Sequence, residues 1–230
     1  MSLEAGTRVT PSRIWMMLAC MWALLALPLT IAAAGPTVLP GDVAIVSGLQ
    51  SWASPPLDTL ARALTVIGSS WPGETLLACT LVIVLLRMGA RRPAMLVAAA
   101  ALAGSLNVLT KLIVASPRPT ADLVQIIQAS TGSGFPSGHA FGATLFYGSI
   151  WLVLPDVVAN AVVCRLLRGV ALLIAIGICW SRIRLGAHWP TDVIGGVLWG
   201  LTILSLLAAL YVSDWKHVLP PSLRAGTLGE

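Results

Sequence analysis

Residues 134–155, GFPSGHAFGATLFYGSIWLVLP, decide how this sequence folds. The tetrapeptide Pro136–His139 suits the start of a helix, and an uncharged run follows it directly. Comparable apolar runs recur along the chain, and they are continuous rather than alternating. Continuous runs favour membrane-spanning helices of about 20 residues over barrel strands. The predicted spans are 14–34, 73–89, 94–114, 137–155, 163–181 and 191–212.

The composition also indicates a membrane protein. The 230 residues are 57% hydrophobic and only 10% charged, whereas soluble domains average about 25% charged residues. We predict a single all-α, polytopic membrane domain over residues 1–230, with six transmembrane helices and tails at about 1–13 and 213–230. The uncharged stretch 14–41 is longer than a signal-peptide core of about 7–15 residues, so we expect the first helix to be retained. The four cysteines lie inside apolar runs without CxxC spacing and are interpreted as apolar packing residues.

The segment between the first two spans, residues 41–70, has a mixed character. Asp42, Asp58 and Arg62 interrupt its apolar residues, and Pro55-Pro56 separates two short helical patterns. The second pattern is amphipathic, which is typical of a helix lying at a membrane surface. Two short interfacial helices and an ordinary connecting segment both fit this stretch.

Lys and Arg are unequally divided between the two ends of the predicted spans. Nine of the 14 fall on the side of the termini, in the tails and in the turns at 87–93 and 156–168. The positive-inside rule makes that side cytoplasmic, so we predict an inner (cell) membrane protein with both termini in the cytoplasm. The net charge of +5 then reflects topology, and the expected partner is the lipid bilayer rather than nucleic acid.

The remaining five basic residues gather on the side that should avoid them. They are Arg62, Lys111, Arg118, Arg182 and Arg184, and two of the three histidines lie on the same side. Snorkelling towards headgroups explains any one cation, but not this concentration in adjoining loops. Ionisable groups gathered at one membrane interface indicate a functional site.

Two of the three polar stretches on that side suit an anion. Lys111 and Arg118 are seven residues apart, so they can share a helix face. The point charge of a Lys ammonium and the planar set of donors of an Arg guanidinium together can bind a phosphate. Ser137 and Gly138 open a helix whose free N–H groups form an anion site. His139 in the first turn is placed to give a proton to a leaving oxygen.

The third stretch, Ser181–Asp192, supplies the reactive group. Arg182 adds another fork of donors, and His188 and Asp192 are four residues apart, so one helical turn brings the carboxylate to the imidazole. A His held through one ring nitrogen presents the other as a base or nucleophile. Nearby, Gly195, Gly196 and Gly200 allow close helix approach. For Arg184, binding of a second phosphate and contact with a lipid headgroup are both open.

These stretches together resemble the type-2 phosphatidic acid phosphatase superfamily, whose pattern is K-x6-RP, then PSGH, then SR-x5-H-x3-D. This sequence reads Lys111 to Arg118-Pro119, Pro136–His139, and Ser181-Arg182 to His188 and Asp192. The resemblance implies that His188 is the nucleophile and forms a phosphohistidine, that Asp192 orients it, and that His139 protonates the leaving group and then activates water. The phosphate-binding residues it implies are Lys111, Arg118, Ser137, Gly138 and Arg182.

The expected activity is hydrolysis of a lipid phosphate monoester or pyrophosphate at the extracytoplasmic interface. Phosphatidic acid, phosphatidylglycerophosphate and isoprenyl pyrophosphates all fit the site. The outward acids are scattered, so we expect no metal and no other cofactor, with side-chain cations carrying the charge stabilisation. A lipid phosphotransferase using the same intermediate is the alternative. An anion or lipid transporter fits less well, because its site would lie near mid-membrane between repeats.

Overall fold

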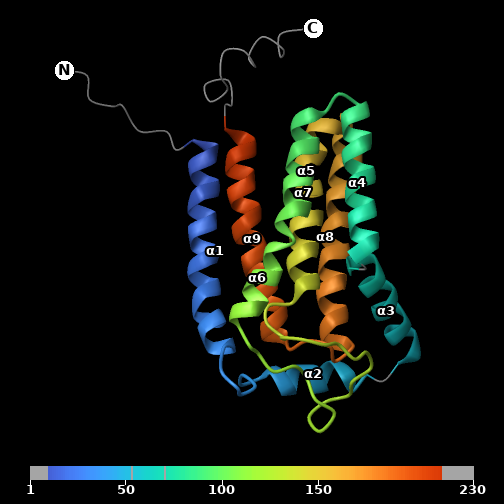
Figure 1. Ribbon diagram of the computed structural model, residues 1–230. Coiled ribbons are helices and arrows are strands. Elements are labelled where there is room, and N and C mark those ends of the chain that lie inside the picture. Colours follow the sequence, from blue (N-terminus) through green and yellow to red (C-terminus); the bar gives the residue numbers. More distant parts are fainter. Residues whose placement is uncertain (1–9, 53, 70, 214–230) are drawn as a thin grey trace, which may run out of the picture.

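The computed structural model describes residues 10–52, 54–69 and 71–213, and these ranges contain helices and no strand (Figure 1). The predicted tails lie largely outside them, as do Arg8, Lys216 and Arg224. The helices are α1 (Pro11–Ala33), α2 (Asp42–Gln50), α3 (Pro55–Ser69), α4 (Trp71–Arg87), α5 (Arg91–Ala103), α6 (Leu106–Ile113), α7 (Gly138–Val157), α8 (Ala161–Arg184) and α9 (Pro190–Val212).

Within the described residues, five segments are long and apolar enough to cross a membrane. They are Pro11–Ala33, Arg91–Ile113, Gly138–Val157, Ala161–Arg184 and Pro190–Val212. The apolar part of α4, Thr75–Arg87, is shorter than the other five. The predicted third span is divided, because a turn at Gly104-Ser105 separates α5 from α6. The all-α membrane fold is therefore confirmed, with five clear candidate spans.

Helix α7 forms the centre of the bundle, between α8, α9 and α5 (Figure 1). Its side chains Phe141, Leu145 and Phe146 are buried in the core. In contrast, α1 and α8 turn large apolar side chains such as Leu24 and Leu173 outwards. Outward apolar side chains are normal where the surrounding solvent is hydrocarbon.

Small residues bring α9 close to α7 and to the loop before it. A Cβ on Gly195 would overlap the Phe135 ring, and one on Gly200 would lie 2.8 Å from Cβ of Thr144. A Cβ on Gly196 would lie 2.6 Å from the Ser137 carbonyl oxygen. The predicted role of these three glycines in close helix approach is thus confirmed.

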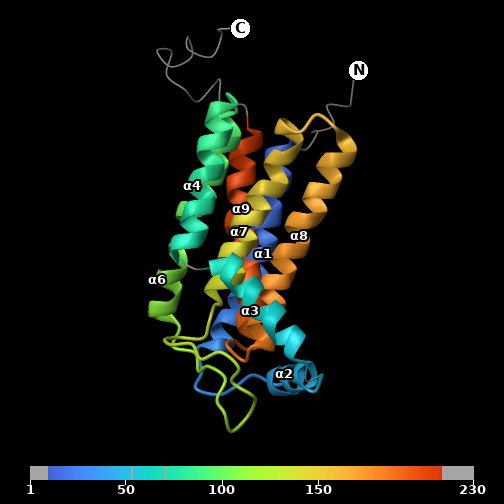
Figure 2. The ribbon, with the colours of Figure 1, turned by 90° about the vertical axis from the view of Figure 1, so that its right-hand side faces the viewer.

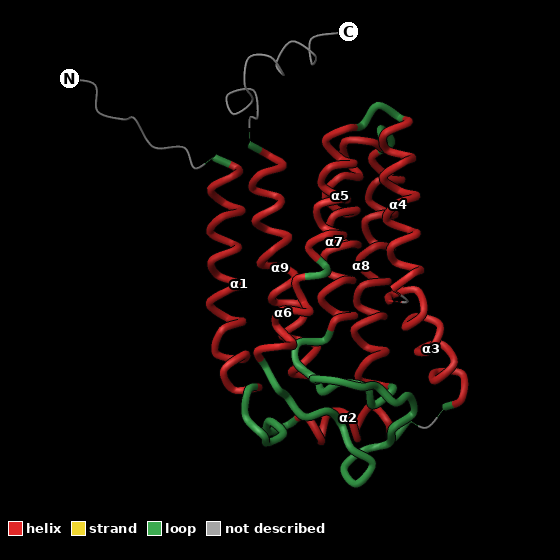
Figure 3. The backbone as a smooth tube through the Cα atoms, in the orientation of Figure 1, coloured by secondary structure: helices red, strands yellow, loops and turns green. Residues whose placement is uncertain are grey.

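The two ends of the bundle differ in character. The start of α1 and the end of α9 lie at one end, whereas α2, the segment 114–137 and the turn before α9 gather at the other (Figures 1 and 3). Helix α2 lies across that second end, and α3 rises obliquely from it towards α4 (Figures 1 and 2). Ala61 and Thr65 of α3 are buried, so this helix packs against the bundle along one face.

Candidate active site

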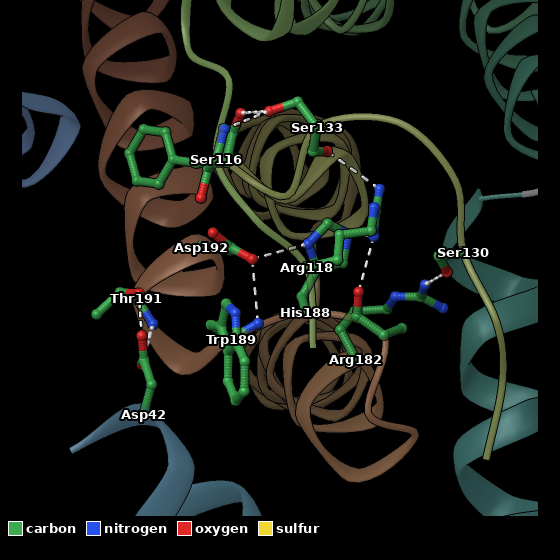
Figure 4. Close-up of polar contacts among 12 residues, drawn as sticks. Asp42, Ser116, Arg118, Ser130, Ser133, Arg182, His188, Trp189, Thr191 and Asp192 are labelled. Atoms are coloured by element: carbon green, nitrogen blue, oxygen red, sulfur yellow. Dashed lines mark hydrogen bonds and ion pairs between the residues drawn. The ribbon is translucent and has the colours of Figure 1, made fainter. Parts of the chain in front are cut away.

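His188 lies between a carboxylate and a guanidinium at the start of α9. Its Nδ1 is 3.3 Å from Oδ2 of Asp192, and its Nε2 is 3.2 Å from an Nη of Arg118 (Figure 4). Asp192 reaches back from the first turn of α9, where Oδ2 also accepts the Trp189 N–H at 3.0 Å. The helix start therefore fixes the carboxylate that holds the imidazole.

The partners of His188 determine which ring nitrogen carries its proton. A guanidinium has only donors, so Nε2 must be the acceptor in its contact with Arg118. The proton then resides on Nδ1, where the Asp192 carboxylate accepts it. Nε2 keeps its lone pair and points towards the cationic side of the site, which is the arrangement a nucleophile requires.

The environment of His188 favours its neutral form. Only 2% of the residue is exposed. Burial lowers the pKa of His188 well below its usual 6.5, and the charges of Arg118, Arg182, Lys111 and His139 lower that pKa further. At neutral pH the ring is a free base.

Lys111 and Arg118 both donate to one short loop. Lys111 Nζ lies 2.8 Å from the Ser133 carbonyl oxygen. Arg118 contacts the carbonyl oxygens of Gly132 at 2.8 Å, Ala187 at 2.7 Å and Ser133 at 3.2 Å. The cations thus converge on His188 while peptide oxygens accept their donors.

Arg182 comes from the last turn of α8 and is also buried, at 2% exposure. Its two Nη atoms lie 3.2 Å from the hydroxyls of Thr65 and Ser130, while its Nε is buried without a partner. Thr65 and Ser130 were not predicted from the sequence, because they lie 117 and 52 residues from Arg182 in the chain. An unpartnered donor in a cationic site suits an anionic oxygen.

The start of α7 completes the cluster. The Ser137 N–H donates to the Asp192 carbonyl oxygen at 2.9 Å, which ties α7 to α9. The Ser137 hydroxyl is buried without a partner, and the N–H groups of the first helical turn lack intrahelical acceptors. His139 follows, half-buried and close enough to affect the charge state of His188. The structure therefore brings together all eight residues singled out from the sequence.

A family model described as the PAP2 superfamily matches residues 92–216, which include all eight of these residues. The chain belongs to the PAP2 superfamily. Its fold is similar to the crystal structure of a transmembrane PAP2-type phosphatidylglycerolphosphate phosphatase from Bacillus subtilis. That similarity has a TM-score of 0.69 and 21% identity, and it covers 89% of this chain and 98% of the other.

Two curated relatives of this PAP2 chain are phosphatases by name. Glucose-6-phosphatase 2 of Homo sapiens is 33% identical over 113 residues, covering 43% of this chain and 28% of the relative. The protein named "Putative undecaprenyl-diphosphatase YbjG" of Escherichia coli (strain K12) is 40% identical over 70 residues, or 29% of each chain. These matches span less than a third of the length of either relative.

Arg184 of this PAP2 protein contacts residues outside the cluster around His188. Its Nε forms an ion pair with Asp58 at 2.8 Å, and an Nη donates to the Leu49 carbonyl oxygen. Only 2% of Arg184 is exposed. The residue therefore fastens the end of α8 to α2 and α3.

Asp42 is a second buried carboxylate near the site, although the sequence marked it only as one of several scattered acids. It accepts the N–H and hydroxyl of Thr191 at 3.0 and 2.6 Å, and so ties α2 to the first turn of α9. No group of three or more His, Cys, Asp or Glu side chains suited to a metal occurs in the part of this PAP2 chain that the structure describes.

Proposed function

We propose that this protein is an integral membrane lipid phosphatase that hydrolyses a lipid phosphate monoester or pyrophosphate through a phosphohistidine at His188. The observation that carries the proposal is the line from Asp192 through His188 to Arg118. In this line Nδ1 is held by a carboxylate and the Nε2 lone pair faces a cation. Membership of the PAP2 superfamily supports phosphatase chemistry.

In the first step, Nε2 of His188 attacks phosphorus and the bond from phosphorus to the leaving oxygen breaks. Lys111, Arg118 and Arg182 stabilise the charge on the phosphoryl oxygens, together with Ser137 and the Gly138 N–H. His139 gives its proton to the leaving oxygen. The ring of His188 becomes cationic as the bond forms, and Asp192 stabilises that charge through the Nδ1 proton.

In the second step, water attacks phosphorus in line with the P–N bond. His139, now neutral, takes a proton from this water, the P–N bond breaks, and the electron pair returns to Nε2. Inorganic phosphate leaves, and His139 is protonated again for the next cycle. Because the three cations supply the charge stabilisation, the proposed reaction is independent of a metal.

The apolar surface beside the site supports a lipid substrate. Leu112 and Ile113 follow Lys111 at the end of α6 and are 79% and 82% exposed. In a bilayer such residues contact hydrocarbon, so a lipid can present its phosphate to Lys111 while its acyl or isoprenyl chains remain in the hydrocarbon of the membrane. Phosphatidic acid, phosphatidylglycerophosphate and isoprenyl pyrophosphates all meet this requirement.

The distribution of charge supports an extracytoplasmic site in one six-span domain. We place the termini in the cytoplasm, because arginines in α1, α4, α5 and the start of α8 lie at the end of the bundle where α1 begins and α9 ends (Figure 1). They are Arg13, Arg87, Arg91, Arg92, Arg165 and Arg168. The second crossing is made by α4, with α3 continuing to the interface on which α2 lies. We place the protein in the inner (cell) membrane, where the positive-inside rule sets the orientation.

The test is phosphate release by the purified full-length protein in detergent, across lipid monophosphates and pyrophosphates. We expect turnover of at least one substrate, unchanged by excess EDTA, and an acid-labile phosphoenzyme after rapid mixing. His188→Ala should abolish both while the protein remains folded and inserted. A His188→Ala variant with more than a few per cent of the activity, or loss of turnover in EDTA, would contradict the mechanism. Adding an acceptor lipid separates hydrolysis from phosphotransfer.

A further inference from the structure

Asn107 is a polar residue in an apolar helix at the edge of the site. It lies within the candidate span Arg91–Ile113, where its neighbours Leu106 and Val108 are exposed to the hydrocarbon side. Asn107 itself faces inwards and is 7% exposed. A polar side chain that faces the interior of a membrane bundle usually has a function.

The position of Asn107 on α6 directs it at the phosphate-binding residues. It precedes Lys111 by four residues, so the two side chains share one face of the helix. Its Nδ2 lies against the start of α7, since a Cβ on Gly138 would be only 2.8 Å from that nitrogen. The amide therefore occupies the space that a side chain at Gly138 would fill, beside the backbone N–H groups of the first turn of α7.

The other end of the amide has no partner. Oδ1 of Asn107 is buried without a hydrogen bond, as is the hydroxyl of Ser137 at the start of the same helix. Buried polar atoms without partners are rare and costly, and they persist where function requires the group. Packing does not explain an amide here, because an apolar side chain of the same shape would fill the space without this cost.

We propose that Asn107 is a further substrate-binding residue, whose Nδ2 donates to a phosphoryl oxygen at the start of α7. This inference rests on the proposed function and adds a neutral hydrogen-bond donor to the three cations Lys111, Arg118 and Arg182. The α6 face then offers the phosphate a charge from Lys111 and a directed hydrogen bond from Asn107. α9 packs on another face of the same turn, where a Cβ on Gly196 would meet the Ser137 carbonyl oxygen.

Three substitutions test the assignment. Asn107→Ala should lower kcat/KM by about ten- to a hundredfold, the loss expected for one hydrogen bond to a charged group. Asn107→Asp should lower it further, because a carboxylate repels the phosphate. Asn107→Leu should match the Ala variant in activity but melt no lower than the wild type, since it removes the unpartnered Oδ1. Ser105→Ala is the matched control, because this exposed hydroxyl bonds only to the Leu102 carbonyl oxygen.

The inference is overturned if the Ala and Leu variants lose thermal stability in parallel with activity, or if Asn107→Asp is more active than Asn107→Ala. Binding of inorganic phosphate to the purified protein separates this outcome from failure of the proposed function. If the wild type binds phosphate but releases none from lipids, a weaker affinity in Asn107→Ala still supports the binding role. An unchanged phosphate affinity refutes that role even in an active enzyme, and a wild type that neither binds nor turns over refutes both proposals.

Discussion

Replacing Asp192 by Asn isolates the charge of the carboxylate from its geometry. Oδ2 accepts from both the Trp189 N–H and Nδ1 of His188. The backbone N–H is always a donor, so the amide introduced by Asp192→Asn must place its oxygen, and not its nitrogen, at this position. The proton of His188 then remains on Nδ1, and the ring keeps its orientation. Only the negative charge beside the developing phosphohistidine cation is lost.

The size of the effect follows from the distance. Two unit charges 3.3 Å apart, the separation of Nδ1 and Oδ2, interact by about 5 kcal/mol at an effective dielectric constant of ~20. The amide oxygen retains a hydrogen bond of about 1 kcal/mol, which leaves a loss of about 4 kcal/mol. Because about 1.4 kcal/mol corresponds to tenfold in rate, kcat/KM should fall roughly a thousandfold.

The assay is steady-state phosphate release by the purified variants, with thermal unfolding measured in the same detergent. Asp192→Ala should be slower than Asp192→Asn, and also less stable by about 1–3 kcal/mol, because it leaves two buried donors without an acceptor. Asp42→Asn is the matched control, since Asp42 is equally buried but contacts Thr191 rather than His188. Its kcat/KM should stay within about threefold of the wild type, which is under ~1 kcal/mol. If Asp192→Asn keeps more than a tenth of the wild-type kcat/KM, the electrostatic role assigned to the carboxylate is wrong.

Four further predictions concern buried groups. Burial and neighbouring cations lower the pKa of His188, so its neutral form persists on acidification and the acidic limb of kcat/KM should have its midpoint below pH 6.5; a midpoint at or above that value would disprove it. For the same reason, below pH 6.5 the His188 ring takes up a proton in the unfolded chain but not in the folded chain. The free energy of unfolding should therefore keep its full value above pH 6.5 and fall as the pH drops below it. Thermal unfolding of the wild type and of a His188→Asn variant at a series of pH values would measure this difference. Asp58→Ala leaves Arg184 buried and unpaired and should cost about 3 kcal/mol of unfolding free energy, with recovery in Asp58→Ala/Arg184→Met; an unchanged melting temperature in the single variant would exclude a stabilising pair. Gly195→Ala places a methyl group in space that the Phe135 ring already fills and should lower both stability and kcat/KM, which melting and turnover of the same sample can check.

Much of the helical fold could be predicted because a bilayer imposes a length and a composition on each span. The span predicted at 191–212 is Pro190–Val212 in the structure, and 137–155 is Gly138–Val157. The contact of His188 with Asp192 was likewise predictable, since a separation of four residues and a nearby helix start bring the two side chains together.

The features that sequence spacing did not reveal depend on partners far along the chain. The break at Gly104-Ser105 turns α6 towards the site, yet the run from residue 94 is uncharged up to Lys111. The sequence left Arg184 to bind a second phosphate or a headgroup, and it did not indicate the ion pair with Asp58, 126 residues away. Two residues apart on a helix point to different faces, so Arg184 does not share the contacts of Arg182.

The carbonyl oxygens that hold Lys111 and Arg118 have a consequence for selectivity. The side chains of Lys111 and Arg118 already donate hydrogen bonds to the carbonyl oxygens of Gly132 and Ser133. An incoming ligand must therefore displace these oxygens before it can bind both cations. A terminal phosphate carries up to two negative charges, whereas the phosphodiester of a bulk phospholipid carries one and competes less well with these oxygens. In the proposed function, the loop at Gly132 and Ser133 would therefore favour a terminal phosphate over the diester lipids of a surrounding bilayer.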